Sequence, residues 1–261
     1  MKGENWTLIH GEAIESLKGM PEASVDAVIC DPPYSSGGSS TNYKTQDPVQ
    51  KYAHSTSRSG NKFPSFAGDA RDQRSYLQWC AWWIERCERV LKTGGYFLTF
   101  IDWRQLPVMT DAVQMGGIVW RGIAVWDKGE CARAPHKGFF KHQCEYIVWG
   151  TKGQIKNRKD AGPFSGCMRH VVLQKDKHHL TGKPTALMRQ LVQVAPPGGL
   201  ILDPFAGSGT TGVGALLEGR RFIGIERETA YVDIARKRLA DAEHEAQSCL
   251  FGAALPMGAQ A

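Results

Sequence analysis

The sequence lacks several features that would assign it to a specialised class of protein. It has no run of about 18 apolar residues, so we expect no transmembrane helix. No apolar segment follows Lys2 and Glu4 near its start, so we expect no signal peptide. It also has no internal repeat. These absences exclude membrane-spanning, secreted and collagen-like proteins and favour a cytoplasmic globular protein.

Cysteines are few and scattered. The chain has seven, and none forms a C-x-x-C pair. One segment holds Cys131, His136, His142 and Cys144, but this spacing matches no standard zinc pattern. We therefore expect free thiols in a reducing compartment and no metal site.

With 261 residues, 42% of them hydrophobic, the chain is long enough to bury a core in one domain. Short apolar and β-branched runs alternate with patterns of helical spacing, which predicts an open α/β sheet. The seven expected strands are Trp6–His10, Val25–Cys30, Tyr96–Ile101, Ile118–Trp126, Glu145–Gly150, Leu200–Asp203 and Phe222–Glu226. The clearest helices are expected over Ser75–Leu91, with a stop at Lys92–Gly95, over Pro184–Ala195 and over Thr229–Glu245.

Three stretches interrupt this alternation. Residues 35–74 are rich in Ser, Gly, Lys and Gln, and residues 154–179 are polar and basic, so both are expected to be irregular insertions. Residues 246–261 are small and apolar and are expected to form a flexible tail. The folded domain is therefore expected over residues 1–245.

The tetrapeptide Asp31-Pro32-Pro33-Tyr34 directly follows the expected strand Val25–Cys30. In a doubly wound sheet, ligands bind beyond the carboxyl ends of the strands. Prolines remove amide donors, so an aspartate and a free carbonyl can together accept both hydrogens of an exocyclic amine. An aromatic ring three residues on can stack on a planar base. A proline-rich surface turn is the alternative interpretation.

A second motif, Asp203-Pro204-Phe205-Ala206-Gly207-Ser208-Gly209-Thr210-Thr211, follows an expected strand and opens a helix. Glycines allow the backbone to approach a ligand, and a helix N-terminus favours a carboxylate or phosphate. Glu226 ends the next expected strand, where an acid suits ribose hydroxyls. With Gly212 the run satisfies G-x-G-x-x-G, which fits a nicotinamide or flavin nucleotide as well as S-adenosylmethionine.

The position of this glycine run decides between those nucleotides. A dinucleotide fold places its glycine loop first and builds two mononucleotide-binding halves after it. Only 49 residues follow Gly212, enough for one more strand and one helix. The nicotinamide interpretation therefore does not fit.

The two motifs in this order resemble the β group of S-adenosylmethionine-dependent amino-methyltransferases acting on DNA, in which D-P-P-Y precedes the cofactor loop. The resemblance covers most of the chain and extends to Ala23–Cys30, Val90–Gly95, Phe140–Val148 and His179–Pro184, where Leu180 departs from the family's H-P-T-x-K-P. It implies a Rossmann-like, doubly wound class I methyltransferase fold. That fold has a mostly parallel seven-stranded sheet with one antiparallel strand.

The resemblance also implies the reaction and the residues that carry it. Methyl would pass by direct in-line displacement to the amine of a flipped-out base. Asp31 and the Pro32 carbonyl would orient the amine, Tyr34 would stack on the base, and the catalytic residues would be Asp31, Pro32, Pro33 and Tyr34. The cofactor-binding residues would be Glu12, Asp31, Thr181, Lys183, Asp203, Phe205, Ala206, Gly207, Ser208, Gly209, Thr210, Thr211 and Glu226.

Five of these cofactor residues lie outside the glycine run, among them Glu12, Thr181 and Lys183. Thr181 and Lys183 would approach the carboxylate of S-adenosylmethionine. Glu12 stands where the family shows an aspartate near the adenine of the cofactor. An ordinary acid at a helix N-terminus is the alternative for Glu12.

The target base follows from the first residue of the tetrapeptide. D-P-P-Y in the family goes mostly with adenine N6 and S-P-P-Y with cytosine N4, so Asp31 favours adenine. Both amines present two hydrogens, and cytosine N4 is therefore the first alternative. Related N-P-P-Y enzymes modify protein glutamine or RNA. From another class, a non-catalytic DNA-binding protein is the alternative, against which the intact Asp31, Tyr34, Gly207 and Gly209 argue.

The positive charge lies mainly in one segment. Thirteen Lys and Arg against five Asp and Glu give residues 121–183 a charge of +8, whereas the whole chain carries +6. Double-stranded DNA is the expected partner, bound there through its phosphates. The expected DNA-binding residues are Lys137, Lys141, Lys156, Arg158, Lys159, Arg169, Lys175 and Lys177. A second copy of the chain and a cognate restriction endonuclease are further candidate partners, in a bacterium or a phage-infected cell.

Overall fold

The computed structural model describes residues 1–35, 71–130, 137–155, 161–171 and 182–253. Its strands form one sheet in the order β1-β8-β7-β2-β3-β5-β4-β6. The strands are β1 Trp6–His10, β2 Val25–Cys30, β3 Leu91–Ile101, β4 Val119–Asp127, β5 Cys144–Thr151, β6 Cys167–Arg169, β7 Leu200–Asp203 and β8 Arg221–Glu226. β5 runs antiparallel to both neighbours and the other pairings are parallel, which confirms the expected single antiparallel strand.

The sheet has eight strands rather than the expected seven. The additional strand β6 lies within residues 154–179, which we expected to be irregular throughout. It pairs in parallel with Val125–Asp127 of β4. Only its central Met168 is buried, and so short a strand leaves no alternation that a sequence pattern can reveal.

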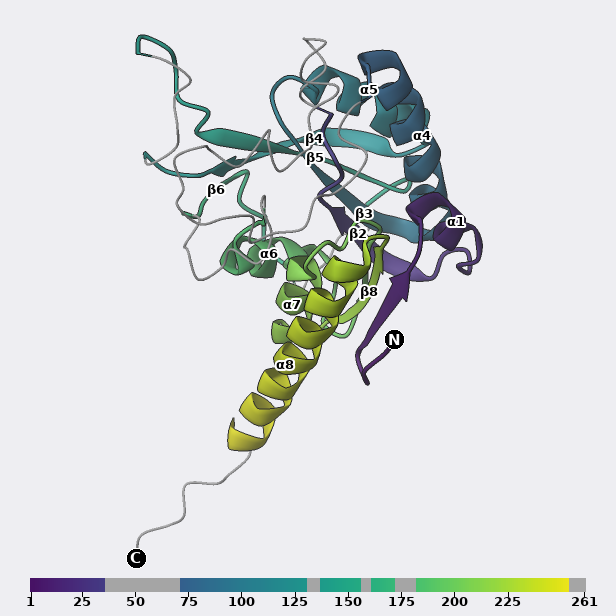
Figure 1. The fold of residues 1–261 in the computed structure, drawn as a ribbon, viewed down its shortest axis with the longest axis vertical. Helices are drawn as coiled ribbons and strands as arrows, with labels where there is room; N and C mark the ends of the chain where they lie inside the picture. The colour runs from purple at the N-terminus through teal and green to yellow at the C-terminus, as the bar shows by residue number, and fades with distance from the viewer. Residues whose placement is uncertain (36–70, 131–136, 156–160, 172–181, 254–261) are drawn as a thin grey trace, which may run out of the picture.

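Helices cover both faces of the sheet (Figure 1). One layer consists of α1 Ala13–Lys18, α4 Gln73–Val90 and α5 Leu106–Met115, and the other of α6 Thr185–Leu191, α7 Thr210–Leu217 and α8 Thr229–Ala253. Each layer buries its own cluster of side chains against the sheet, with Trp83 and Phe97 in the first and Leu187 and Phe222 in the second. Because both faces are covered, Ala27–Cys30 of β2 and Phe97–Ile101 of β3 are buried at every position rather than at alternate ones.

The connection between α4 and β3 differs from the expected helix stop and turn at Lys92–Gly95. Leu91 caps α4 and is also the first residue of β3. Gly94 has a φ of 82°, and a Cβ on Gly95 would lie 2.8 Å from the Lys92 carbonyl oxygen. The register between β2 and β3 shifts at this point. The two glycines therefore form an irregularity inside the strand rather than a turn before it.

Helix α8 runs further than the sequence predicts. It continues past Glu245 to Ala253, into residues expected to form a tail. Ala240, Ala242 and Ala246 favour the helical state. Glu243 also fastens α8 to the start of the chain, because its carboxylate accepts the backbone N–H of Asn5 at 2.6 Å. Residues 254–261 lie outside the described residues.

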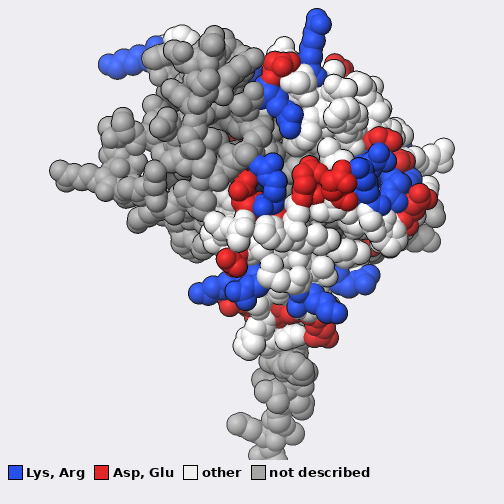
Figure 2. All heavy atoms as spheres, turned by 45° about the vertical axis from the view of Figure 1, so that its right-hand side comes forward, with Lys and Arg blue, Asp and Glu red and all other residues white. Residues whose placement is uncertain are grey.

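The outer surface of the first helical layer carries charges of both signs. In Figure 2, acidic and basic side chains lie next to one another across the visible, coloured part of the molecule. Among the strands, Lys92 of β3 and Asp26 of β2 form an ion pair with Nζ and Oδ1 2.7 Å apart. Within the described ranges, no helix is long and apolar enough to cross a membrane.

Candidate active site

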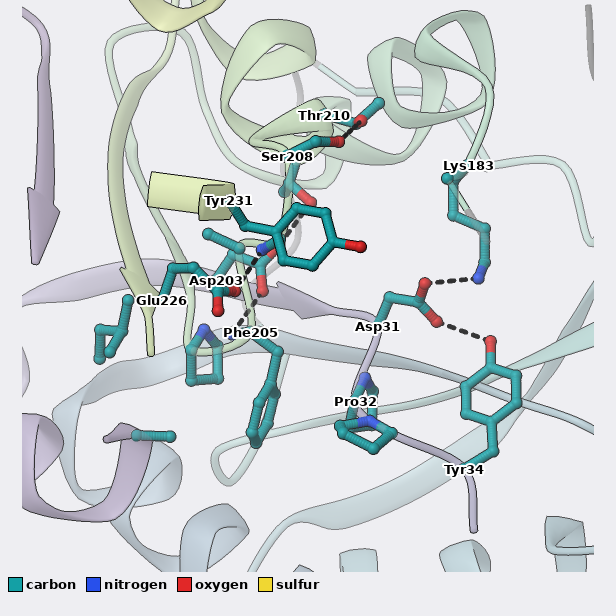
Figure 3. Close-up of a pocket in the computed structure, with 18 of the residues that line it drawn as sticks. Asp31, Pro32, Tyr34, Lys183, Asp203, Phe205, Ser208, Thr210, Glu226 and Tyr231 are labelled. Carbon is teal, nitrogen blue, oxygen red and sulfur yellow. Dashed lines mark hydrogen bonds and ion pairs between the residues drawn. The ribbon is translucent and has the colours of Figure 1, made fainter. Parts of the chain in front are cut away.

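The predicted motifs meet at one edge of the sheet. Asp31 follows β2, Asp203 ends β7, Glu226 ends β8 and Glu12 lies just beyond β1. Because these strands are parallel, their carboxyl ends share an edge. All four side chains line one cavity of about 530 Å³ (Figure 3).

The antiparallel strand β5 brings a second carboxylate to Asp31. Because β5 runs against β3, its first residues, Glu145 among them, reach the same edge. Lys183 Nζ lies 2.5 Å from Asp31 Oδ2 and 3.4 Å from Glu145 Oε2. The Tyr34 hydroxyl lies 2.7 Å from Asp31 Oδ1 and 3.2 Å from Glu145 Oε2, and Lys128 Nζ lies 3.2 Å from Glu145 Oε1. Two carboxylates, two lysines and one phenol thus form a single network.

Burial and charge oppose one another in this network. Burial raises the pKa of Asp31, and the adjacent Lys183 offsets only part of that effect. Burial also acts to raise the pKa of Glu145, but Lys183 and Lys128 together lower it below its ordinary value. Burial acts to lower the pKa of Lys183, which Asp31 and Glu145 nevertheless raise. Lys183 is therefore a buried cation held between two carboxylates.

The glycine-rich run forms a tight loop between β7 and α7. Asp203 holds this loop, because its Oδ1 accepts the Phe205 N–H at 2.9 Å and its Oδ2 accepts the Thr211 hydroxyl at 2.6 Å. Gly209 is the N-cap of α7 and has a φ of 81°, in the left-handed region that favours glycine. A Cβ there would lie 3.1 Å from the Cβ of Ala235 on α8.

Glu226 and Arg238 hold the same loop from its other side. The backbone N–H of Gly207, whose φ is 52°, donates to Glu226 Oε2 at 2.8 Å, and Glu226 Oε1 accepts a second backbone N–H at 2.7 Å. Arg238 donates to the Ser208 carbonyl at 2.6 Å and to Thr210 Oγ1 at 3.0 Å. The loop is therefore fixed by side chains from β7, β8 and α8.

Asp203 is a buried carboxylate and Glu226 a half-buried one, and the hydrogen-bond donors of both are neutral. Burial raises the pKa of Asp203 to about 7, because its hydrogen bonds from Thr211 and Phe205 offset only part of the cost of burying the charge. Burial likewise raises the pKa of Glu226. A ligand with a positive charge and hydroxyl groups suits such a pair. S-adenosylmethionine has both, so these residues fit it.

The structure brings most of the predicted site residues to the cavity. Its lining includes Glu12, Asp31, Pro32, Pro33, Tyr34, Lys183, Asp203, Phe205, Ala206, Gly207, Ser208, Thr210, Thr211 and Glu226. Thr181 lies outside the described residues. Glu12 also caps α1 by accepting the Glu15 N–H at 3.0 Å, so the helix-terminus alternative is confirmed and its contact with the cofactor stays a prediction.

Only part of the predicted DNA-binding set can be placed. Lys137, Lys141 and Arg169 are exposed, and Arg169 pairs with Asp127 at 3.1 Å. The residues outside the described ranges are Lys156, Arg158, Lys159, Lys175 and Lys177. The described residues contain no group of three side chains able to hold a metal ion.

Several residues of the cavity carried no prediction. They are Trp79, Trp103, Arg104, Lys128, His142, Glu145 and Tyr231. Tyr231 is a buried residue of α8 whose ring projects into the cavity beside Asp203 (Figure 3). Glu145 is the single acid of an otherwise apolar strand, a signal that could have been noticed. The others belong to no local motif, because the sheet order alone brings them together.

Known proteins are similar to this chain over most of its length. Residues 25–237 match the model of the family described as DNA methylase. The type II methyltransferase M2.DpnII of Streptococcus pneumoniae is 31% identical over 258 residues, 91% of this chain and 90% of that protein. The type II methyltransferase M.HinfI of Haemophilus influenzae is 27% identical over 260 residues, 90% of this chain and 68% of that protein.

Solved structures share the fold. The complex of M1.HpyAVI with SAM has a TM-score of 0.64 at 24% identity and covers 90% of this chain and 98% of its own. The cytosine-N4-specific PvuII DNA methyltransferase has a TM-score of 0.67 at 16% identity, and the match covers 95% of this chain and 94% of that one. The likeness confirms the α/β Rossmann-like class I fold. Since the family model matches most of the chain, the protein belongs to the DNA methylase family of N6 and N4 methyltransferases and is an S-adenosylmethionine-dependent DNA methyltransferase.

Proposed function

We propose that this enzyme methylates the exocyclic N6 of an adenine flipped out of a DNA duplex. The observation that carries the proposal is the position of Asp31. It directly follows β2. On one side of β2 lie β7 and β8, which end in Asp203 and Glu226, and on the other side lie β5 with Glu145 and β4, which Lys128 follows. A group bound at Asp31 therefore stands next to both ends of the cavity.

Asp31 would act as the acceptor that orients the amine. Its carboxylate and the Pro32 carbonyl would accept the two amine hydrogens, which aims the nitrogen lone pair at the methyl group. The same carboxylate would stabilise the positive charge that develops on the nitrogen. Lys183 and Tyr34 hold its two oxygens in place, as the dashed contacts in Figure 3 show. The Tyr34 ring would stack on the base.

The other end of the cavity would hold S-adenosylmethionine, which supplies a methyl group already activated on a sulfonium. Asp203 and the loop residues Phe205–Thr211 would surround its methionine part, where the Phe205 ring can attract a cation. Glu226 would accept the ribose hydroxyls. Glu12 lies just after β1, the neighbour of β8, where it would meet the adenine. Thr181 would approach the carboxylate of the cofactor, and so would Lys183, whose Nζ lies against Asp31.

Adenine is proposed over cytosine because Asp31 opens the tetrapeptide, as it mostly does in the N6 members of the family. Cytosine N4 is the second candidate, because its amine offers the same two hydrogens to Asp31. A non-catalytic DNA-binding role is disfavoured by the intact network around Asp31 and the intact glycine loop.

The test is to incubate the enzyme with labelled S-adenosylmethionine and DNA from a methylation-deficient bacterium. Digestion to nucleosides followed by mass spectrometry should give labelled N6-methyladenine. Labelled N4-methylcytosine instead would overturn the adenine proposal. The same DNA with its adenines already methylated at N6 is the matched control and should accept no label.

Two partners are proposed on weaker support. Both curated relatives are type II methyltransferases, a class that suggests a cognate restriction endonuclease in a bacterial or phage-infected cytoplasm. A homodimer is the proposed assembly, because residues 154–179 are a short segment for reading a DNA site alone. Light scattering of the purified enzyme, with and without DNA, tests whether it forms a homodimer.

A further inference from the structure

The order of the strands divides the cavity into two ends. Glu12 follows β1, Glu226 ends β8 and Asp203 ends β7, and Asp31 follows β2 next to them. β3, β5 and β4 follow on the other side of β2. Under the proposed function, the first three strands hold the cofactor. The target base must then enter from the side of β3 and β5, because in-line displacement places the attacking amine nitrogen and the leaving sulfur on opposite sides of the methyl carbon.

The side of β3 and β5 carries three residues that the proposed chemistry does not use. Trp103 and Arg104 directly follow β3, and His142 lies just before β5. Ile101 of β3 pairs with Tyr146 of β5, so these two loops meet at the mouth of the cavity. We name Trp103, Arg104 and His142 the rim cluster.

The rim cluster is a stack of flat groups. The rings of Trp103 and His142 lie nearly parallel, at 18°, with centroids 6.2 Å apart. The Arg104 guanidinium carbon lies 4.7 Å from the centroid of the Trp103 ring. Even with these neighbours, Trp103 is 51% exposed, whereas most large aromatic residues of the site are covered. An exposed indole at the mouth of a cavity leaves apolar surface in water, which is unfavourable unless a partner covers it.

We propose that the rim cluster stacks against a nucleobase next to the flipped one, on the strand that enters the cavity. This inference rests on the proposed function. Every base has a flat π-face, and aromatic rings combined with arginine are the usual platform for a base that has lost its neighbour in the duplex. Flipping removes that neighbour. Trp103 would replace it and keep the strand aligned with Asp31, and Arg104 would lie within reach of the same strand's phosphates.

Trp103→Ala tests this proposal, with Trp82→Ala as its matched control. Trp82 is 53% exposed, lies on α4 and does not line the cavity, so it matches Trp103 in residue type and exposure. The probe is a fluorescent duplex that the wild-type enzyme methylates. Loss of stacking on one base should weaken binding of this duplex by about 5- to 100-fold in Trp103→Ala. Trp82→Ala should bind it as the wild type does, and the affinity for S-adenosylmethionine should be unchanged in both.

Two further variants sharpen the test. Trp103→Phe keeps a stacking ring and should recover most of the lost affinity. His142→Ala removes the ring that supports Trp103 and should weaken duplex binding by a smaller factor. Unchanged duplex affinity in Trp103→Ala overturns the proposal, and so does an equal loss in Trp82→Ala. Neither result affects the proposed function, which fails only if the wild-type enzyme labels no adenine.

Discussion

The two ends of the cavity stabilise their carboxylates by different means. At the end formed by β7 and β8, Asp203 and Glu226 accept hydrogen bonds from backbone N–H groups and from the Thr211 hydroxyl. At the end formed by β2 and β5, Asp31 and Glu145 lie against Lys183, and Glu145 also against Lys128. Neutral donors thus serve the first pair and cations, the buried Lys183 and the half-buried Lys128, serve the second.

This difference shows in the electrostatics of the acids. Burial raises the pKa of Asp203 to about 7, and its neutral donors do not compensate. Glu145 is also buried, yet two lysines lower its pKa. The first end therefore lacks a positive charge that a cationic cofactor would supply, whereas the second end contains its own. The second end can accept a neutral base without a change in net charge.

The largest effect is expected from Asp31→Ala. This change removes the acceptor that orients the amine and stabilises its developing charge, so kcat should fall by about 10²- to 10³-fold or more. The affinity for S-adenosylmethionine should remain, because the loop at Asp203 is untouched. Turnover is measured with saturating DNA and cofactor, and cofactor binding by calorimetry.

Asp26→Ala is the control for that experiment. Asp26 lies on β2, the strand that Asp31 follows, but it does not line the cavity. Its carboxylate pairs with Lys92 instead. Its loss should lower stability and leave kcat close to the wild-type value. Normal turnover in Asp31→Ala would show that the second end of the cavity is not where the amine is held.

The next largest effect is expected from Asp203→Asn, in the pH dependence of the free energy of unfolding. The pKa of Asp203 is about 7 in the folded chain and 3.8 without burial, so the folded state keeps a proton that the unfolded state has lost. This contribution to stability is full below about pH 4 and disappears as the pH rises through about 7. When the pH is lowered from about 8 to about 5, the free energy of unfolding of the wild type should rise by about 2–3 kcal/mol more than that of Asp203→Asn.

Denaturant titrations of both proteins without cofactor at several pH values measure this difference, and other titrating groups cancel in it. Parallel pH profiles would mean that Asp203 is as well compensated as Glu145. Saturating S-adenosylmethionine should flatten the wild-type profile, because its positive charge would hold Asp203 ionised.

The two ends also differ in how far the sequence predicts them. Asp203–Thr211 is a contiguous motif, since one loop needs glycines at fixed positions and an acid at its start. Asp31–Tyr34 is contiguous too. Glu145 comes from a strand far along the chain, and only its antiparallel pairing with β3 brings it to Asp31. No pattern of spacing encodes that meeting.

The same reasoning applies to the fold. β1, β2 and β7 were predicted to the residue, because each is a short apolar run bounded by polar residues. β6 was missed because a three-residue edge strand is defined by its partner β4. The end of α8 was misplaced because Gln247, whose amide donates to the Glu4 carboxylate at the start of the chain, looks like an ordinary surface residue in the sequence.

A smaller effect is expected from Gly209→Ala. The left-handed φ of 81° and the nearby Ala235 both oppose a side chain there, so the loop would shift away from α8. The affinity for S-adenosylmethionine should fall by about tenfold, equivalent to about 1.4 kcal/mol. Gly219→Ala is the control, with a φ of 68° and no atom within 4 Å of the added Cβ. Gly219→Ala should lose similar stability and keep its affinity for S-adenosylmethionine. An equal loss of affinity in both variants would show that the loop at Gly209 does not bind the cofactor.

The smallest effect is expected from Glu145→Gln, read in the pH dependence of kcat with both substrates saturating. The groups that face Asp31 are Lys183, Glu145, Tyr34 and, from β7, Asp203. Among them the Glu145 charge raises the pKa of Asp31, so its removal should lower that pKa and leave Lys183 to Asp31 alone. Asp31 must be ionised to accept the amine. The acid limb of the profile should therefore move to lower pH, and the variant should turn over faster than the wild type at a fixed acidic pH, by less than about tenfold. An unmoved limb, or one displaced to higher pH, would show that Glu145 acts only through packing.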